Sequence, residues 1–391
     1  KRLTRAGRER PRVVVQNPPD FSVEGLPLGI TDQRSLAITI RPKSGAATEH
    51  VAAAKVAALH VRVNSVALHP PNGISLGCEA CELQTGVELT PGQNRIEIYV
   101  VDERGAPSRM LTSVVDLVVP KAKPRLFVLA VGVSDYAEDR LDLAYAAKDA
   151  QDIAERLAKS TRFSETRVRL LLNQEATAKN LARADKFFED ATEEDTVLLF
   201  FAGHGFLDSV RDYFFATSDI SLAAPTQKAF RYDDLTSLVR RVRARQRIVM
   251  LDTCHAGEAD RSAQQGTPAG GKNVVKKGFR GLVLGENEDF AKSFELMRTL
   301  FFDQNDGTGA IMISSSGGAE YAYEKDEHKN GVFTHALLRA LGNSTLDSNR
   351  DSSVTLSEVF AGVESEVRAL TGGAQHPNIR TGNLDLDPIL F

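Results

Sequence analysis

The sequence lacks several features that mark specialised classes of protein. It holds three cysteines in 391 residues, an odd and small number that excludes a disulfide-rich scaffold and favours a reducing, cytoplasmic location. No apolar run approaches the roughly 18 residues of a membrane-spanning helix, and no signal-peptide core stands near the start. The formal net charge is −4, which excludes a generally basic protein that coats nucleic acid. We therefore expect neither a membrane nor a nucleic acid as partner.

The composition is that of a globular protein, with 42% hydrophobic and 26% charged residues. The length predicts two to three domains. The chain begins at Lys1 rather than Met, so we expect a fragment of a longer protein. Residues 1–12 form a basic arm, which we interpret as solvated, with binding to an anionic partner as the alternative.

Residues 13–119 carry the pattern of an all-β module. Ile96, Ile98 and Val100 alternate with Glu97 and Tyr99, which is typical of a half-buried strand. Several such runs separated by turn residues predict a small β-sandwich of immunoglobulin-like type. The module shows no acid–base constellation, so we expect it to bind or dock a partner, to act as a spacer, or to hold a neighbouring domain latent.

One cysteine pair lies within this module. Cys78 and Cys81 form a lone CxxC between predicted strands, whereas a redox CxxC opens a helix and a zinc site needs a second ligand pair. We favour a structural or incidental role over a local disulfide or a shared metal site.

The hydrophobic pattern of the sequence changes after a linker at residues 120–124 that begins and ends with proline. From 125 to 391, apolar strands alternate with amphipathic helices, which predicts a mostly parallel sheet with helices on both faces. Strands are expected at 126–133, 168–172, 196–201, 248–251 and 310–313. Helices are expected at 143–157, 180–191 (N-cap Thr177), 232–242, 289–302, 333–341 and 355–370 (capping box Thr355 and Glu358).

Two segments in this region carry residues suited to nucleophilic catalysis. His204, between two glycines, and Cys254 each follow directly on a buried strand, so both are expected at the carboxyl edge of the sheet, on neighbouring strands. An imidazole can take the proton of a thiol, and the thiolate can then attack a carbonyl carbon. The backbone N–H groups of Gly205 and Cys254 are candidates for an oxyanion hole. Taken singly, a lone Cys or His is more often structural, but the pair at two strand ends favours function.

Asp252 precedes Cys254 by two residues and so points the same way along an extended strand. A carboxylate beside a thiol raises the pKa of the thiol and hinders catalysis, so Asp252 is expected to have another task. Pairing with a basic substrate side chain is the simplest such task.

These motifs resemble those of caspase-like cysteine peptidases, most closely the metacaspase and bacterial orthocaspase branch. The resemblance rests on Ala-Gly-His204-Gly and Asp252-Thr-Cys254-His-Ala-Gly. Weaker agreement extends over residues 124–391, in segments listed by their first and last residues: Leu129–Tyr136, Ala147–Ala150, Ser314–Glu324, Gly331–Thr334 and Gln375–Pro377. The sequence departs from the metacaspase pattern at Ala146 and Ala202, which leaves the choice between Arg and Lys open.

The resemblance implies a caspase-like α/β fold and a His204–Cys254 dyad. It also implies that Asp149 and Asp252 line the pocket for a basic P1 residue, the residue before the cleaved bond. The insert at 258–309, expected to be mobile, stands where family members are cut during activation. It offers four basic candidate processing sites: Lys272, Lys276, Lys277 and Arg280.

Calcium is a candidate cofactor by the same resemblance. Five aspartates lie in the relevant part of the chain, without EF-hand spacing: Asp208, Asp212, Asp219, Asp233 and Asp234. Asp303 and Asp306 have a weaker calcium-loop character and are better interpreted as a turn. No metal site is assigned from the sequence.

We therefore predict a cysteine endopeptidase that cleaves protein substrates after Arg or Lys. Activation from a latent form by loop cleavage, by an upstream protease or by a cofactor, and a role in bacterial signalling or defence, follow by analogy. The main alternative is a catalytically silent caspase-like scaffold that binds partners through the β-module. An acyl hydrolase or transferase for non-peptide substrates is a second alternative. A nucleotide-binding domain is disfavoured, because no glycine-rich phosphate loop follows the first strand of this region.

Overall fold

The computed structural model describes residues 17–47, 52–69, 72–119, 123–208, 212–253, 274–275, 280, 282–283, 308–317, 320–381 and 387–391. The chain divides into two compact units. One unit extends to Pro120, and the other comprises Lys121 onward together with Asn64–Val66. The predicted helix at 289–302 and most of the predicted insert lie outside the described residues. Within the described part, no helix is long and apolar enough to cross a membrane.

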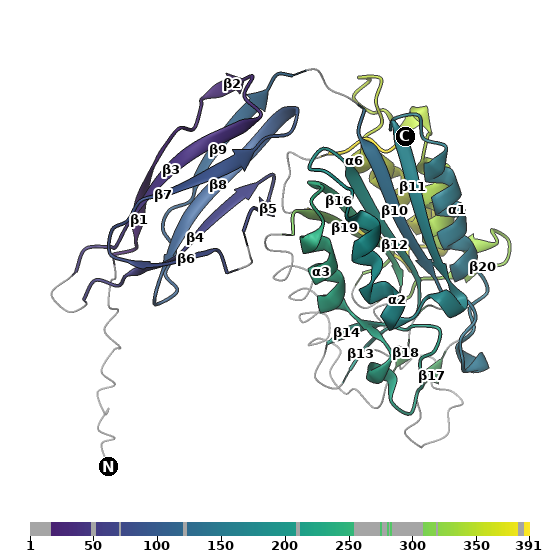
Figure 1. The fold of residues 1–391 in the computed structure, drawn as a ribbon. Coiled ribbons are helices and arrows are strands. Elements are labelled where there is room, and N and C mark those ends of the chain that lie inside the picture. Colours follow the sequence, from purple (N-terminus) through teal and green to yellow (C-terminus); the bar gives the residue numbers. More distant parts are fainter. Residues whose placement is uncertain are drawn as a thin grey trace, which may run out of the picture. The chain divides into compact units, whose positions relative to one another are not determined.

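The first unit is an all-β sandwich, as predicted (Figure 1). One sheet has the order β1(Asp20–Glu24), β3(Ser35–Lys43), β7(Leu83–Glu88). The other has the order β2(Gly29–Thr31), β9(Leu111–Leu117), β8(Gly92–Asp102), β4(Val56–Val63), β5(Val66–Ala67), with β6(Ile74–Cys78) paired to β4. Alternate residues of both sheets, such as Ile38 of β3 and Ile96 and Ile98 of β8, are fully buried in one apolar core. The alternation read in the sequence therefore marks the inward face.

The structure shows a local disulfide at the CxxC pair, whereas the sequence favoured a structural or incidental role. Cys78 ends β6 and forms a disulfide with Cys81. The turn between β6 and β7 brings the two Cα atoms to 6.1 Å, within the range that a disulfide needs. Disulfides are rare in cytosolic proteins, so this bond does not support the cytoplasmic location inferred from the cysteine count. That location stays a prediction.

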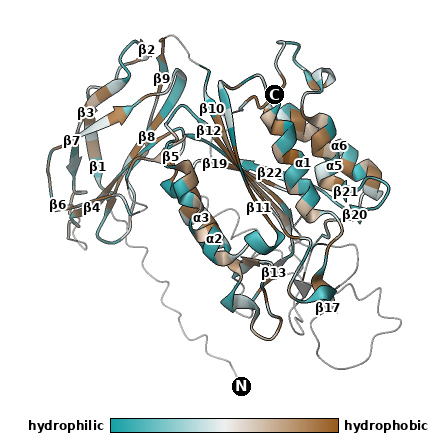
Figure 2. Ribbon diagram, turned by 45° about the vertical axis from the view of Figure 1, so that its right-hand side comes forward, coloured by the Kyte–Doolittle hydropathy of each residue, from teal (hydrophilic) through white to brown (hydrophobic). Residues whose placement is uncertain are grey.

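The second unit is built on a six-stranded sheet flanked by helices, which confirms the predicted fold class (Figures 1 and 2). The strand order is β11(Glu165–Leu172), β10(Arg125–Gly132), β12(Thr196–Gly203), β16(Gln246–Thr253), β19(Ala310–Ser314), β22(Asn378–Thr381). The first five strands are parallel, and β22 is antiparallel to β19. Strands β10, β12, β16 and β19 are buried along almost their whole length, because helices cover both faces.

Figures 1 and 2 show α1, α5 and α6 on one face of the sheet and α2 and α3 on the other. The bounds are α1(Ala146–Ala158), α2(Ala178–Ala182), α3(Tyr232–Arg241), α5(Val332–Ala340) and α6(Leu356–Thr371). Short 3₁₀ helices lie at Asp139–Leu141, Asn173–Glu175, Ala184–Phe188, Pro225–Gln227 and Ser344–Leu346. Smaller sheets are β13(Gly205–Leu207)–β14(Tyr213–Phe215)–β15(Phe230–Arg231), β17(Val274–Val275)–β18(Leu282–Val283) and β20(Glu324–Lys325)–β21(Asn330–Gly331).

One predicted helix is wrong in form. Residues 180–191 do not make a single helix: α2 ends at Ala182, and a 3₁₀ helix occupies Ala184–Phe188. Ala184 and Phe188 are both buried in the core, so the 3₁₀ segment is still packed against it. The predicted N-cap is confirmed, since the Thr177 hydroxyl accepts a hydrogen bond from the N–H of Asn180 at 3.3 Å.

The capping box of α6 is confirmed and supplies a stability test. Thr355 accepts from the N–H of Glu358, and the Glu358 carboxylate accepts from the N–H of Thr355 at 3.0 Å. We expect Thr355→Ala to cost about 1 kcal/mol, or roughly 3 °C in the Tm of this unit. Exposed Ser357 in the same turn is the matched control, and Ser357→Ala should leave the Tm unchanged. If calorimetry gives both variants the same Tm as the wild type, the stabilising effect of the capping box is contradicted.

Candidate active site

The carboxyl edge of the sheet brings the two motif segments together. Strands β12 and β16 are parallel neighbours, as predicted, with Ala202 opposite Asp252 and Gly203 opposite Thr253. His204 and Cys254 are the next residues along these strands, and adjacent strands lie about 4.8 Å apart. Cys254 itself, with His255, lies outside the described residues.

His204 is buried, and its backbone and ring are held from the loop after β10. Ring Nε2 lies 2.8 Å from the carbonyl oxygen of Leu141, which can only accept, so Nε2 carries the ring proton. Its backbone N–H donates to the hydroxyl of Tyr136 at 3.0 Å. Among the described residues, Nδ1 has no hydrogen-bond partner. Burial lowers the pKa of His204 to about 4. The ring is therefore neutral at pH 7, with Nδ1 unprotonated.

Gly203 is required for this arrangement. Its φ of +154° lies outside the range that other residues readily adopt. A Cβ atom at this position would also meet the Tyr136 hydroxyl at 3.0 Å. The glycine before His204 thus lets the tyrosine approach and hold the His204 backbone.

The N–H of Gly205, a candidate oxyanion donor, is not used in the pairing of β13 with β14. The N–H of Ala216 donates to the carbonyl of His204 at 2.9 Å, across the Gly205–Phe215 pair of β13 and β14. In an antiparallel ladder, this makes Gly205 and Phe215 a non-hydrogen-bonded pair. The N–H of Gly205 therefore points away from β14, free of the ladder.

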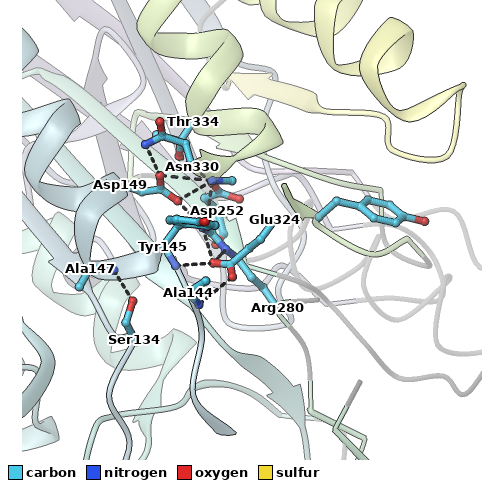
Figure 3. A network of polar contacts seen from close by, with 12 residues as sticks. Ser134, Ala144, Tyr145, Ala147, Asp149, Asp252, Arg280, Glu324, Asn330 and Thr334 are labelled. Atoms are coloured by element: carbon cyan, nitrogen blue, oxygen red, sulfur yellow. Dashed lines mark hydrogen bonds and ion pairs between the residues drawn. The ribbon is translucent and has the colours of Figure 1, made fainter. Parts of the chain in front are cut away.

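Asp149 and Asp252, predicted as partners in a pocket, converge on one cation (Figure 3). Asp149 lies in the first turn of α1, and Asp252 lies near the end of β16. Both carboxylates form ion pairs with the buried guanidinium of Arg280: Asp149 with Nη2, and Asp252 with Nη1 at 2.6 Å. The two aspartates that the resemblance groups in one pocket thus lie around a single cation, which is supplied by one of the four candidate processing residues.

A third carboxylate of this pocket was not predicted. Oε1 of Glu324, on β20, lies 3.2 Å from Nε and 3.0 Å from Nη2 of Arg280. Two segments complete the pocket, one ending in Glu324 and one from Gly331 to Thr334. Both belong to the regions that resemble the family, but neither contains a motif that assigns a role to its residues. We call Asp149, Asp252 and Glu324 the acidic pocket.

Neutral groups fix the carboxylates of the acidic pocket. The Asn330 side-chain amide donates to Asp149 Oδ1 at 2.7 Å, and the Thr334 hydroxyl donates to Asp252 Oδ2 at 2.6 Å. Gly331 forms a thin wall, since a Cβ there would meet the guanidinium of Arg280 at 2.7 to 2.9 Å. The pocket is thus shaped for a flat, doubly hydrogen-bonding cation, which is the geometry of arginine.

The backbone of Arg280 is also held. Its N–H donates to the carbonyl of Ala322 at 3.3 Å, two residues before Glu324. Main-chain pairing combined with a side chain in a pocket is how extended peptides are commonly bound. Three other candidate processing sites (Lys272, Lys276 and Lys277) lie outside the described residues.

The described residues contain no group of three or more His, Cys, Asp or Glu side chains that could hold a metal ion. Two of the five candidate calcium aspartates, Asp212 and Asp233, pair with Arg231 at 2.8 and 3.4 Å, and a third, Asp219, pairs with Lys228 at 3.4 Å. Asp303 and Asp306 lie beyond the described part.

EF-hand-like spacing does occur elsewhere, which the sequence analysis overlooked. It lies in the loop before α6, at Asp347, Asn349, Asp351 and Glu358. There the carboxylates accept hydrogen bonds from the loop's own backbone, for example from Ser352 N–H to Asp347 at 2.9 Å. Calcium stays a prediction from the resemblance.

The fold and the site together define a caspase-like α/β protein. A family model described as "Caspase domain" matches residues 125–387, so the chain belongs to the caspase-domain family, a family of cysteine peptidases. A solved protein of Geobacter sulfurreducens is 18% identical, over 67% of this chain and 95% of that one, with a TM-score of 0.45. Caspase-1 of Spodoptera frugiperda is 12% identical, over 68% and 90%, with a TM-score of 0.38. A search of curated proteins found no match.

The acidic pocket makes the stability of the folded protein depend on pH. Burial raises the pKa of Asp149 from 3.8 to about 7, although Arg280 opposes the shift. The folded protein therefore binds this proton more tightly than the unfolded chain. Ionisation of Asp149 therefore lowers the stability as the pH rises from about 4 to about 7.

We expect Asp149→Asn to remove this dependence, so that the Tm of the variant gains on that of the wild type between pH 5 and pH 8. Asp152→Asn, about one turn later on the same helix and with its side chain 27% exposed, is the control and should follow the wild type. Thermal melts at several pH values decide this. Parallel Tm curves for wild type and Asp149→Asn would show that Asp149 does not titrate in this range.

Proposed function

We propose that the protein is a cysteine endopeptidase that cleaves protein substrates after Arg, and less readily after Lys, with Cys254 as nucleophile and His204 as base. The observation that carries this proposal is the buried guanidinium of Arg280 in the acidic pocket. One wall of that pocket, Asp252, lies near the end of β16, two residues before Cys254 in the sequence. A basic side chain in this pocket therefore lies next to the nucleophile.

The chemistry follows from the groups at the strand ends. Nδ1 of His204 takes the proton of Cys254, and the thiolate attacks the carbonyl carbon of the scissile bond. The N–H groups of Gly205 and Cys254 stabilise the oxyanion. The imidazolium then donates its proton to the departing amine, which leaves an acyl-enzyme. Water attacks the acyl-enzyme with His204 again as base, which releases the acid and restores the thiol.

The charge of the acidic pocket sets the specificity. Three carboxylates face one site, so an Asp or Glu side chain in the same place would meet like charges without compensation. An arginine can pair with all three, as Arg280 does. A lysine presents a single ammonium group to the same carboxylates, which supports cleavage after Lys at a lower rate.

Arg280 also supports a latent form of the enzyme. A residue of the chain itself fills the pocket that a substrate would use, and it belongs to the predicted processing insert. We infer that Arg280 is the main processing site, ahead of Lys272, Lys276 and Lys277, cut by the enzyme itself or by an upstream protease. Regulation through the β-module rests on the lack of an acid–base constellation in that module. A requirement for calcium and a role in bacterial signalling or defence rest on the resemblance alone.

A peptide panel tests the proposed activity. Peptides that differ only at P1 (Arg, Lys, Asp, Leu) are incubated with wild type, Cys254→Ala and His204→Ala under reducing conditions, with calcium or with a chelator. We expect cleavage after Arg, weaker cleavage after Lys, and a loss of at least about 1,000-fold in both variants. Asp cleavage would refute the role of the pocket. No cleavage, even after the insert is nicked, would favour the silent scaffold.

Processing is tested on the purified chain. N-terminal sequencing of fragments from the wild type should find a new terminus at Gly281, absent from Cys254→Ala and from Arg280→Gln. Lys277→Gln, three residues earlier, is the control and should still be cut. A terminus produced equally by Cys254→Ala would mean that the chain does not process itself.

A further inference from the structure

A short segment after β10 touches both the catalytic histidine and the acidic pocket. Its residues are Leu141–Tyr145, and we call it the 141–145 segment. At one end the carbonyl of Leu141 accepts from His204 Nε2 at 2.8 Å. At the other end the N–H groups of Ala144 and Tyr145 donate to the Glu324 carboxylate, at 2.9 Å to Oε2 and 3.2 Å to Oε1. Figure 3 shows Ala144, Tyr145 and Glu324 together at the pocket.

The middle of the segment is fixed as well. The N–H of Leu143 donates to the carbonyl of Ser134 at 2.9 Å, and the Asp142 carboxylate accepts from the N–H of Tyr136 at 2.9 Å. The side chains of Leu141 and Leu143 are buried. The segment is therefore one packed, hydrogen-bonded unit, with Ala144 three residues from the Leu141 carbonyl.

Glu324 holds the end of the 141–145 segment at Ala144 and Tyr145. Its Oε1 accepts from Tyr145 N–H and from both Nε and Nη2 of Arg280, and its Oε2 accepts from Ala144 N–H. A carboxylate that accepts several N–H bonds is strongly held and exerts strong directional control on its donors. The cation in the pocket and the segment that carries the Leu141 carbonyl thus share one carboxylate.

The geometry points to a positioning role for Glu324 toward His204. Glu324 fixes the 141–145 segment so that the Leu141 carbonyl holds Nε2–H and leaves Nδ1 as the ring nitrogen that can accept a proton from the thiol. When His204 becomes imidazolium, the same carbonyl stabilises its charge, so a well-placed segment favours the thiolate. This inference rests on the proposed function, because it needs the Cys254–His204 dyad, and it assigns Glu324 a task beyond contact with a basic side chain.

Alkylation of Cys254 by iodoacetamide separates the two tasks. The thiolate sulfur forms a bond to the carbon that bears iodine, iodide leaves, and the reagent has no basic group to enter the acidic pocket. The rate is followed on the full chain by mass spectrometry of the Cys254 peptide from pH 5 to 9. Four proteins are compared with wild type: Glu324→Gln, Glu327→Gln, His204→Ala and Cys254→Ala, the last as a blank.

We expect Glu324→Gln to slow alkylation at pH 7 by roughly 3- to 10-fold and to move the pH profile upward, because glutamine cannot accept from both N–H groups as a carboxylate does. Glu327 lies on the same hairpin with its side chain 63% exposed, and Glu327→Gln should stay within about 2-fold of wild type. On P1-Arg peptides, Glu324→Gln should lower kcat as well as raise KM.

The outcomes are distinguishable. If His204→Ala alkylates like wild type, the dyad fails, and the proposed function and this inference fail together. If His204→Ala is slow but Glu324→Gln matches wild type, with only KM changed, Glu324 belongs to the pocket alone and this inference is overturned. Circular dichroism checks folding. If Glu324→Gln does not fold, Glu324→Asp replaces it, since aspartate keeps the charge but is shorter by one methylene. An alkylation rate of Glu324→Asp equal to that of the wild type overturns the inference equally.

Discussion

The buried guanidinium of Arg280 organises the functional half of this protein. A buried charge is costly unless it is paired and hydrogen-bonded, and here three carboxylates and a backbone carbonyl surround it. Those carboxylates come from α1, β16 and β20, which are far apart in the sequence. Their mutual repulsion would be severe without a cation between them. The pocket is therefore built to hold a cation, and in this structure Arg280 of the chain itself supplies one.

The sheet makes the pairing of this pocket with a nucleophile possible. The register of β12 and β16 places the two strand ends side by side, and the residues that follow them are His204 and Cys254. Asp252 lies on β16, which ends at Thr253, one residue before Cys254 in the sequence. In the proposed mechanism this rigid element links the binding of a basic side chain to the attack on the bond beside it.

Much of this arrangement could be predicted from the sequence. His204, Cys254 and Asp252 stand directly at the ends of apolar strands, where strand alternation and parallel topology dictate their neighbourhood. The roles of Asp149 and of the basic insert came from family resemblance rather than from spacing. Glu324 could not be predicted, because its partners, the N–H groups of Ala144 and Tyr145, are about 180 residues away and carry no side-chain signal.

Other differences have similar causes. The disulfide of Cys78 and Cys81 depends on the turn that brings their Cα atoms together, which the CxxC pattern alone does not specify. The helix expected at 180–191 breaks because Ala184 and Phe188 are buried along a tightened path, a tertiary effect that overrides local periodicity. Strand β22 has only four residues, none fully buried, so it leaves no alternating pattern to read.

The central claim is that Arg280 occupies the pocket that a substrate arginine would use. It is tested most directly by the rate at which an arginyl acyloxymethyl ketone, which alkylates a catalytic thiol, labels Cys254 in wild type and in Arg280→Ala. The account predicts faster labelling of Arg280→Ala, because the pocket is vacated, and no labelling of either protein by the aspartyl analogue. Equal rates in the two proteins, or preference for the aspartyl reagent, would contradict it.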